Sequence, residues 1–176
     1  MSNLFEIRFE KEHVQMKKLQ ILLVVTIMGA LLLSACSGGE SEQAEPGVTA
    51  NEMVDQMLAE VEQPAMMELT TDQVKEIYNI DPEMLEEYAI RVPMMNVKTN
   101  EIAILKVKNE ADVPEVEKAL KQRAESVQKQ FETYLPDQYE NAKNYQLITK
   151  GNYVLFVISD QADELVRVYD TFFTQQ

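Results

Sequence analysis

Cys36 is the only cysteine of the chain, and the residues before it give its thiol a defined chemistry. Leu33, Ser34 and Ala35 precede it, an apolar residue and two small ones, which is the pattern of a lipobox. Small residues before a cleavage site fit the groove of a signal peptidase, and a thiol can accept a diacylglyceryl group as a thioether. The pattern predicts that Cys36 is lipidated and becomes the first residue of the mature protein.

The stretch before the lipobox has the composition of a secretory signal peptide. Two lysines precede an apolar run over residues 21–33, which is shorter than the roughly 20 residues that span a bilayer. We therefore expect residues 1–35 to be the signal-peptide region. Translation should begin at Met16, because the glutamates in residues 1–15 do not suit a signal peptide. These features predict a lipoprotein on the outer face of the cell membrane. The alternatives are a transmembrane anchor and a secretory signal with an incidental cysteine.

Four polar residues after Cys36 could form a binding site. Asp81 belongs to an acidic cluster at 81–87, whose carboxylates could hold a hard cation or act as a pair in glycoside hydrolysis. Asn96, Glu101 and Lys106 lie in or beside the first predicted hairpin and could form a polar site there. Solvated helix surface is the better explanation of the acidic cluster, and solvated strand edges explain the residues beside the hairpin equally well.

Missing residue types exclude several classes of chemistry. The single histidine, His13, lies before Cys36, so the mature chain has none. It therefore cannot build a Ser-His-Asp or Cys-His nucleophile system, or a zinc site with imidazole ligands. Methionine pairs at 66–67 and 94–95 could bind Cu(I), although methionine more often fills gaps in a core. We expect no cofactor and no metal site, and we assign no catalytic residue.

The charge of the chain argues against nucleic acid as a partner. Of its 16 Lys and Arg and 30 Asp and Glu, four basic and three acidic residues precede Cys36. Thus 12 basic and 27 acidic residues remain from Cys36 onward, a mature net charge of −15. Nucleic-acid binding draws most of its affinity from a basic surface. The expected partners are the lipid bilayer, through the diacylglyceryl group on Cys36, and an unidentified protein or small ligand.

Periodicity and capping patterns indicate the elements that must position these residues. Residues 36–48 are small, polar and acidic and predict a lipidated cysteine followed by a flexible linker, while residues 49–176 predict one globular domain. Capping patterns at Thr49 and Thr70 begin two N-terminal helices. The remaining predicted elements are strands at 88–92, 102–107, 145–149 and 153–158, and helices that begin at Asp112 and Ser159.

The order of these elements predicts an α+β fold with a four-stranded antiparallel sheet. The sheet consists of two hairpins, each followed by a helix, with helices packed on it and two helices at the N-terminal end. The longest helix should run from Asp112 to Pro136, with Arg123 and three lysines facing water. Parts of strands 102–107 and 153–158 are apolar on both sides, so the second face should also be covered, by the N-terminal helices or a second copy.

Three short elements resemble a family of small Gram-positive lipoproteins known only as a domain of unknown function (4358-type). They are Tyr78-Asn79-Ile80-Asp81-Pro82, Met95-Asn96-Val97 and Glu101-Ile102-Ala103, together with the turn at 150–154. The resemblance implies membership and a surface location. It implies no catalytic residue.

These observations favour a non-catalytic, lipid-anchored domain that binds a partner or ligand outside the cytoplasm. The alternatives are a histidine-independent hydrolase that uses carboxylates, and a transport-associated solute-binding accessory protein. A binding module should show an exposed apolar patch or an unpaired sheet edge. A catalyst should show a deep polar pocket, around Asp81 or Glu101. We expect the first pattern.

Overall fold

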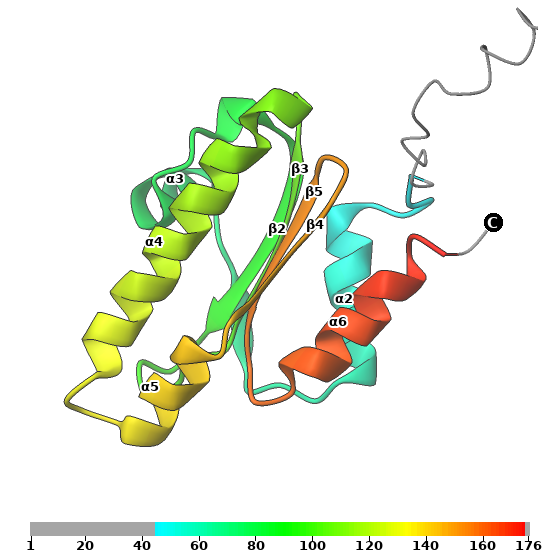
Figure 1. The fold of residues 1–176 in the computed structure, drawn as a ribbon. Helices are drawn as coiled ribbons and strands as arrows, with labels where there is room; N and C mark the ends of the chain where they lie inside the picture. Colours follow the sequence, from blue (N-terminus) through cyan, green and yellow to red (C-terminus); the bar gives the residue numbers. More distant parts are fainter. Residues whose placement is uncertain (1–44, 175–176) are drawn as a thin grey trace, which may run out of the picture. The chain divides into compact units, whose positions relative to one another are not determined.

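The computed structural model describes residues 45–174 (Figure 1). The predictions for the signal peptide, the lipobox, Cys36 and most of the linker therefore lie outside the described residues. Within residues 45–174, no helix is long and apolar enough to cross a membrane. The helices and strands, in chain order, are α2 Ala50–Glu60, β1 Met66–Glu68, α3 Thr71–Tyr78, η2 Pro82–Met84, β2 Leu85–Pro93, β3 Glu101–Val107, η3 Glu110–Asp112, α4 Val113–Phe131, α5 Pro136–Lys143, β4 Gln146–Lys150, β5 Tyr153–Ile158 and α6 Ala162–Thr171.

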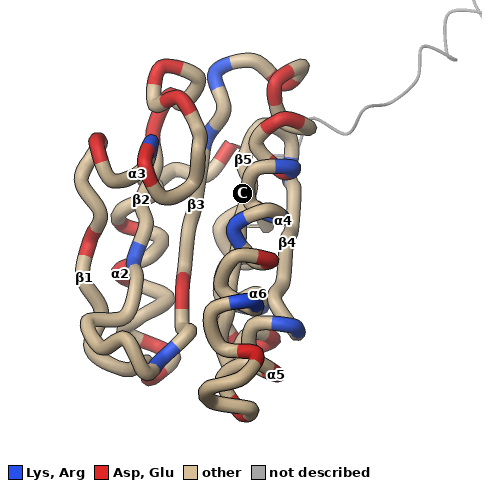
Figure 2. The backbone as a smooth tube through the Cα atoms, turned by 90° about the vertical axis from the view of Figure 1, so that its left-hand side faces the viewer, with Lys and Arg blue, Asp and Glu red and all other residues tan. Residues whose placement is uncertain are grey.

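The fold is α+β, as predicted, but its antiparallel sheet has five strands and not four. Their order is β1-β2-β3-β5-β4, and Figure 2 shows β1 and β4 at the two edges. The sequence analysis missed β1, whose Met66 and Glu68 pair with Pro93 and Arg91 of β2. Three residues are too few for an alternating pattern to be recognised. Proline has no N–H to donate to a neighbouring strand. Pro93 is tolerated at the end of β2 because the pairing of β2 with β3 stops at Arg91 and Ile102, so β3 has no residue opposite Pro93.

The predicted long helix is α4, which ends before Pro136, and a further helix follows it. α4 ends at Phe131, and Pro136 is the first residue of α5, which the sequence analysis did not predict. Proline suits the first turn of a helix because the N–H that it lacks would have no intrahelical partner there. The same residue that signals the end of one helix can therefore begin the next.

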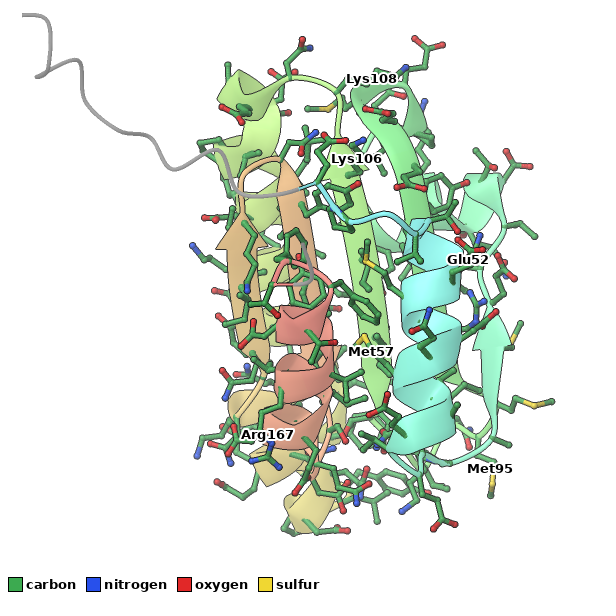
Figure 3. The ribbon with its side chains drawn as sticks, turned by 90° about the vertical axis from the view of Figure 1, so that its right-hand side faces the viewer. Glu52, Met57, Met95, Lys106, Lys108 and Arg167 are labelled. Carbon is green, nitrogen blue, oxygen red and sulfur yellow. The ribbon has the colours of Figure 1, made fainter. Side chains whose placement is uncertain are left out.

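Alternate residues of the central strands supply two separate cores. On β3, Ala103 and Leu105 pack with α3, α4 and α5, whereas Ile102 and Ile104 pack with α2 and α6. Figure 1 shows the sheet edge-on between these two groups of helices, and Figure 3 shows α2 and α6 side by side over it, with Met57 of α2 labelled. The second face is thus covered by one N-terminal helix and the last helix. α3 lies on the other face, with α4.

The predicted capping patterns are present at the two N-terminal helices. The Thr49 N–H donates to the Glu52 carboxylate at 2.8 Å, and the Thr70 N–H donates to the Gln73 side chain at 2.9 Å. A side chain that accepts from the capping residue satisfies a backbone donor that the helix itself leaves open. Asn79 is the C-cap of α3 and takes a left-handed conformation (φ 54°).

Candidate functional site

A buried ion pair lies where β3 begins. Glu101 is the first residue of β3 and is 1% exposed. Arg123 of α4 binds it side-on: Nε donates to Oε1 at 3.1 Å and to Oε2 at 3.2 Å, and Nη2 donates to Oε2 at 2.7 Å. The hydroxyl of Tyr78, the last residue of α3, donates to Oε1. Side chains from two helices thus converge on one carboxylate of a strand. A buried charge needs such partners, because without them it destabilises the fold.

The environment of this cluster fixes the protonation of its donors. Burial, and then the charge of Glu101, raise the pKa of Tyr78 well above its ordinary value, so the phenol stays neutral and can donate. Burial alone would lower the pKa of Arg123, but its hydrogen bonds to Glu101 and the opposite charge outweigh burial and raise it. Arg123 therefore stays charged. Together the two side chains provide four hydrogen bonds to Glu101.

A pocket of about 170 Å³ opens beside this cluster. It lies between α3 and α4, the end of β2 and the loop that leads to β3. Half of its lining residues are polar and half are apolar. The polar ones are Asn96, Lys98, Thr99, Glu101, Arg123 and Gln130, and the apolar ones are Ile77, Val92, Pro93, Met95, Val127 and Phe131.

The loop over the pocket is fixed by α5. The Thr99 N–H donates to Oε1 of Gln138 at 3.0 Å, and the Thr99 hydroxyl accepts from Nδ2 of Asn141 at 3.0 Å. Thr99 and Gln138 are both buried. The helix that the sequence analysis missed therefore holds the loop that carries Met95, Asn96 and Lys98.

Large apolar side chains that are exposed in residues 45–174 belong to residues that line this pocket, or that adjoin or pair with its lining residues. There are five of them: Met67, Ile77, Met94, Met95 and Tyr134. Ile77 and Met95 line the pocket, and Met94 adjoins Met95. Met67 pairs with the lining residue Val92 across β1 and β2, and the Tyr134 N–H donates to the carbonyl of Phe131, another lining residue. An exposed apolar patch is typical of an interaction surface. We refer to these five residues as the apolar rim.

Comparison with known families places this region in a recognised domain. The family described as "Domain of unknown function (DUF4358)" matches residues 59–159, more than half of the chain. The chain belongs to this family. The match contains every residue that lines the pocket and every residue of the apolar rim. No curated protein and no solved structure matches the chain.

The DUF4358 segment brings together only two of the four polar residues selected from the sequence. Asn96 and Glu101 line the same pocket. Asp81 does not reach it, because its carboxylate accepts from the Glu83 N–H at 3.1 Å and caps η2. Asp81 is therefore accounted for as a capping residue.

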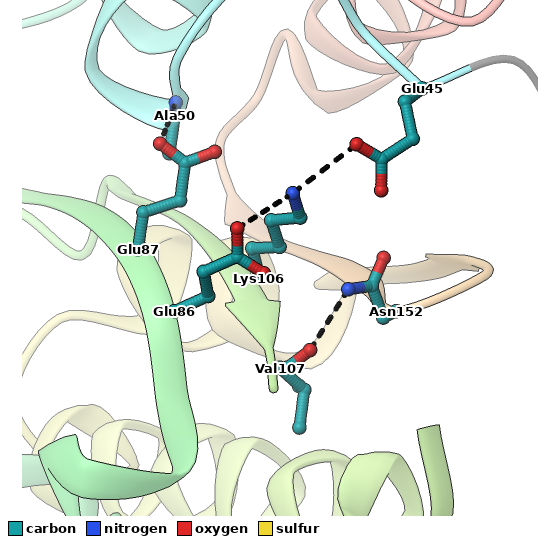
Figure 4. Close-up of polar contacts among 7 residues, drawn as sticks. All are labelled: Glu45, Ala50, Glu86, Glu87, Lys106, Val107 and Asn152. Carbon is teal, nitrogen blue, oxygen red and sulfur yellow. Dashed lines mark hydrogen bonds and ion pairs between the residues drawn. The ribbon is translucent and has the colours of Figure 1, made fainter. Parts of the chain in front are cut away.

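Lys106 lies near the opposite end of β3, on the face that packs with α2 and α6. Its Nζ lies 3.1 Å from Glu86 Oε1 and 3.4 Å from Glu45 Oε2, as Figure 4 shows. Burial alone would lower the pKa of Lys106, but its hydrogen bonds, that to Glu86 foremost, outweigh burial and raise it. A β-strand advances about 3.3 Å per residue, so Lys106 lies roughly 17 Å along the strand from Glu101.

Sequence reasoning missed Arg123, which it placed facing water. Its side chain is 20% exposed and binds Glu101. Arg123 lies three residues after Leu120 and four before Val127, which are both buried on the apolar side of α4. The available signal was the position of Arg123 at the border of the apolar stripe of α4, where the aliphatic stem of an arginine can pack on apolar surface.

The pocket only partly agrees with the expected pattern. Its lining includes two exposed apolar side chains, Ile77 and Met95. A concave pocket at Glu101 is present as well, but it is small and half apolar, and its one carboxylate is bound by Tyr78 and Arg123.

Proposed function

We propose that this protein is a lipoprotein anchored through Cys36 on the extracytoplasmic side of the membrane, and that its DUF4358 domain binds a partner or ligand without catalysing a reaction. The lipobox, the apolar run before it and the likeness to Gram-positive lipoproteins support the anchor. The observation that carries the binding role is the pocket at Glu101, which opens among the exposed residues of the apolar rim.

The chemistry of the pocket favours binding over catalysis. A carboxylate that acts as a nucleophile or general base needs a free lone pair directed at the substrate. The oxygens of Glu101 accept four hydrogen bonds from Arg123 and Tyr78. Hydrolysis by paired carboxylates needs a second one within about 10 Å across the substrate. Among the described residues that line the pocket, Glu101 is the only acidic one.

The anchor is tested by lipid labelling in cells. The wild-type chain should incorporate an alkyne-tagged fatty acid and partition with membranes. A Cys36→Ala variant should incorporate none and remain as an uncleaved precursor or appear in the medium. Ser37→Ala is the matched control, and it should behave like the wild type. Labelling of the Cys36→Ala variant would contradict the proposed anchor.

The binding surface is tested by photocrosslinking on intact cells. A photoreactive amino acid is placed at Met95, in the apolar rim, or at Arg167, an exposed residue of α6; Figure 3 labels both. We expect a discrete adduct, identified by mass spectrometry, from position 95 and none from position 167. Equal adducts from both positions, or none from position 95, would contradict binding at the pocket.

A further inference from the structure

Arg123, which lines the pocket, has a hydrogen-bonding edge that Glu101 does not use. Its Nε and Nη2 bind Glu101, which is the side-on mode of a guanidinium. This mode leaves Nη1, and the second N–H of Nη2, directed along the other edge of the same plane. Within residues 45–174, Nη1 of Arg123 has no hydrogen-bond partner and is not among the buried unpaired atoms, which are Arg91 Nη1 and Tyr169 Oη. Nη1 of Arg123 is therefore not fully buried, and the residue lines the pocket.

The charge at this pocket differs from that of the whole domain. Two cations, Arg123 and Lys98, line it with a single acid, Glu101, which Arg123 already neutralises. The chain from Cys36 onward carries a net charge of −15. Asp137 interacts with Lys98 as well: the pKa of Asp137 is lowered mainly by a hydrogen bond from Gln138, and the charge of Lys98 contributes. A planar anion that enters the pocket would meet the donors of Arg123 first, since a guanidinium edge matches a carboxylate in geometry.

The size and lining of the pocket limit what accompanies the anion. A volume of about 170 Å³ corresponds to about six water molecules at about 30 Å³ each. Val127 and Phe131, both buried, supply an apolar wall. The ligand portion inside the pocket is therefore a few carbon atoms and a carboxylate. The apolar rim extends beyond the pocket mouth.

We infer that the pocket binds a carboxylate carried on a short apolar group, with the free edge of Arg123 and the ammonium of Lys98 on the carboxylate, and Val127 and Phe131 against the apolar group. This inference rests on the proposed binding function and specifies its ligand class. The carboxylate could belong to a free short-chain acid or to the last, apolar residue of a peptide; both present the same chemistry.

The test uses the lipidated protein in a non-ionic detergent, with the methionine methyl groups labelled for NMR. Met95 reports on the pocket, and Met57 of α2, which is fully buried on the other face of the sheet, is the internal control. The probes are acetate, propionate, butyrate and pentanoate, pentanamide, and an acetylated Ala-Ala-Leu peptide with either a free or an amidated carboxyl terminus.

We expect saturable shifts of the Met95 methyl signal with the acids and none at Met57. Affinity should rise about fourfold for each added methylene until the pocket is full. The two amides should bind at least about tenfold more weakly than their acids, because an uncharged group cannot form a charge-assisted pair. If the peptide with a free carboxyl terminus binds more tightly than pentanoate, the natural ligand is a peptide terminus. If the two bind with equal affinity, the natural ligand is a free short-chain acid.

Two variants distinguish a specific carboxylate site from nonspecific binding. Lys98→Gln should weaken the acids about fivefold and leave the amides unchanged, which is the effect of one unit charge at about 4 Å in water-like surroundings. Lys121→Gln removes an exposed lysine of α4 that does not line the pocket, and it should change neither. Equal binding of acids and amides at Met95 would overturn this inference and leave the proposed function intact. No saturable shift with any acid would overturn it too, and the crosslinking experiment alone would then decide the proposed function.

Discussion

Replacing Arg123 by leucine should lower the free energy of unfolding by about 3 kcal/mol, because it leaves Glu101 buried with only one of its partners. Leucine fills part of the space of the arginine stem and continues the apolar side of α4. Helix propensity is preserved because leucine and arginine are similarly good helix formers. The loss therefore reports on the carboxylate. Urea unfolding followed by circular dichroism measures it.

The magnitude follows from the surroundings of Glu101. Arg123 provides three of its four hydrogen bonds, and the carboxylate is 1% exposed. Removing one partner of a buried pair costs about 3–5 kcal/mol. We take the lower end of this range because the pocket at Glu101 gives water a route to the orphaned oxygens. Domains of this size are stable by roughly 5–15 kcal/mol, so the variant should still fold.

Two controls distinguish this explanation from general damage to α4. Arg167→Leu removes an arginine of α6 that is 69% exposed and paired with Glu164, and it should change stability by less than about 0.5 kcal/mol. The triple variant Glu101→Leu, Arg123→Leu, Tyr78→Phe removes the whole polar cluster, and it should recover most of the loss. If Arg123→Leu costs less than 1 kcal/mol, or if the triple variant is as unstable as the single one, the buried charge is not the cause.

Three further effects should be measurable by the same unfolding assay. Tyr78→Phe should cost about 1.5–3 kcal/mol through the lost hydrogen bond to a charged group, and a cost below 0.5 kcal/mol would contradict that bond. The raised pKa of Tyr78 means that the folded phenol keeps its proton above about pH 10 while the unfolded one loses it, so stability falls as pH rises there; Tyr78→Phe should make this fall shallower by up to about 1.4 kcal/mol per pH unit, and an unchanged slope would refute the assignment. Asn79→Ala should cost about 1 kcal/mol, because alanine tolerates the left-handed C-cap of α3 less well, whereas Asn79→Gly should cost nothing.

Local patterns predicted most elements of this fold. The caps at Thr49 and Thr70, and strands such as β5 that are apolar on both sides, indicated helices and a sheet covered on both faces. β1 escaped because a three-residue strand is defined by its pairing with β2, which local sequence does not encode. α5 escaped because Pro136 suits a helix start as well as a helix end.

The site was harder to predict than the fold for the same reason. Glu101 and Asn96 could be selected as polar residues beside a hairpin, but what makes Glu101 distinctive is its pairing with Arg123 and Tyr78. These partners lie 22 and 23 residues away along the chain, on two different helices. Only the packing of α3 and α4 over β3 brings them together, so no spacing rule could have connected them.

The contact between Lys106 and Glu45 has a consequence for how the domain would be presented to its surroundings. Glu45 contacts Lys106 near one end of β3 (Figure 4), and the pocket lies at the other end, at Glu101. With a lipid on Cys36, only the eight linker residues 37–44 would separate the bilayer from this contact, a length of at most roughly 30 Å when fully extended. The domain would then be attached close to the Lys106 end of β3, whereas the pocket lies at the Glu101 end. A Lys106→Gln substitution would remove the ion pair with Glu45 and so lengthen the linker, without changing the residues that line the pocket.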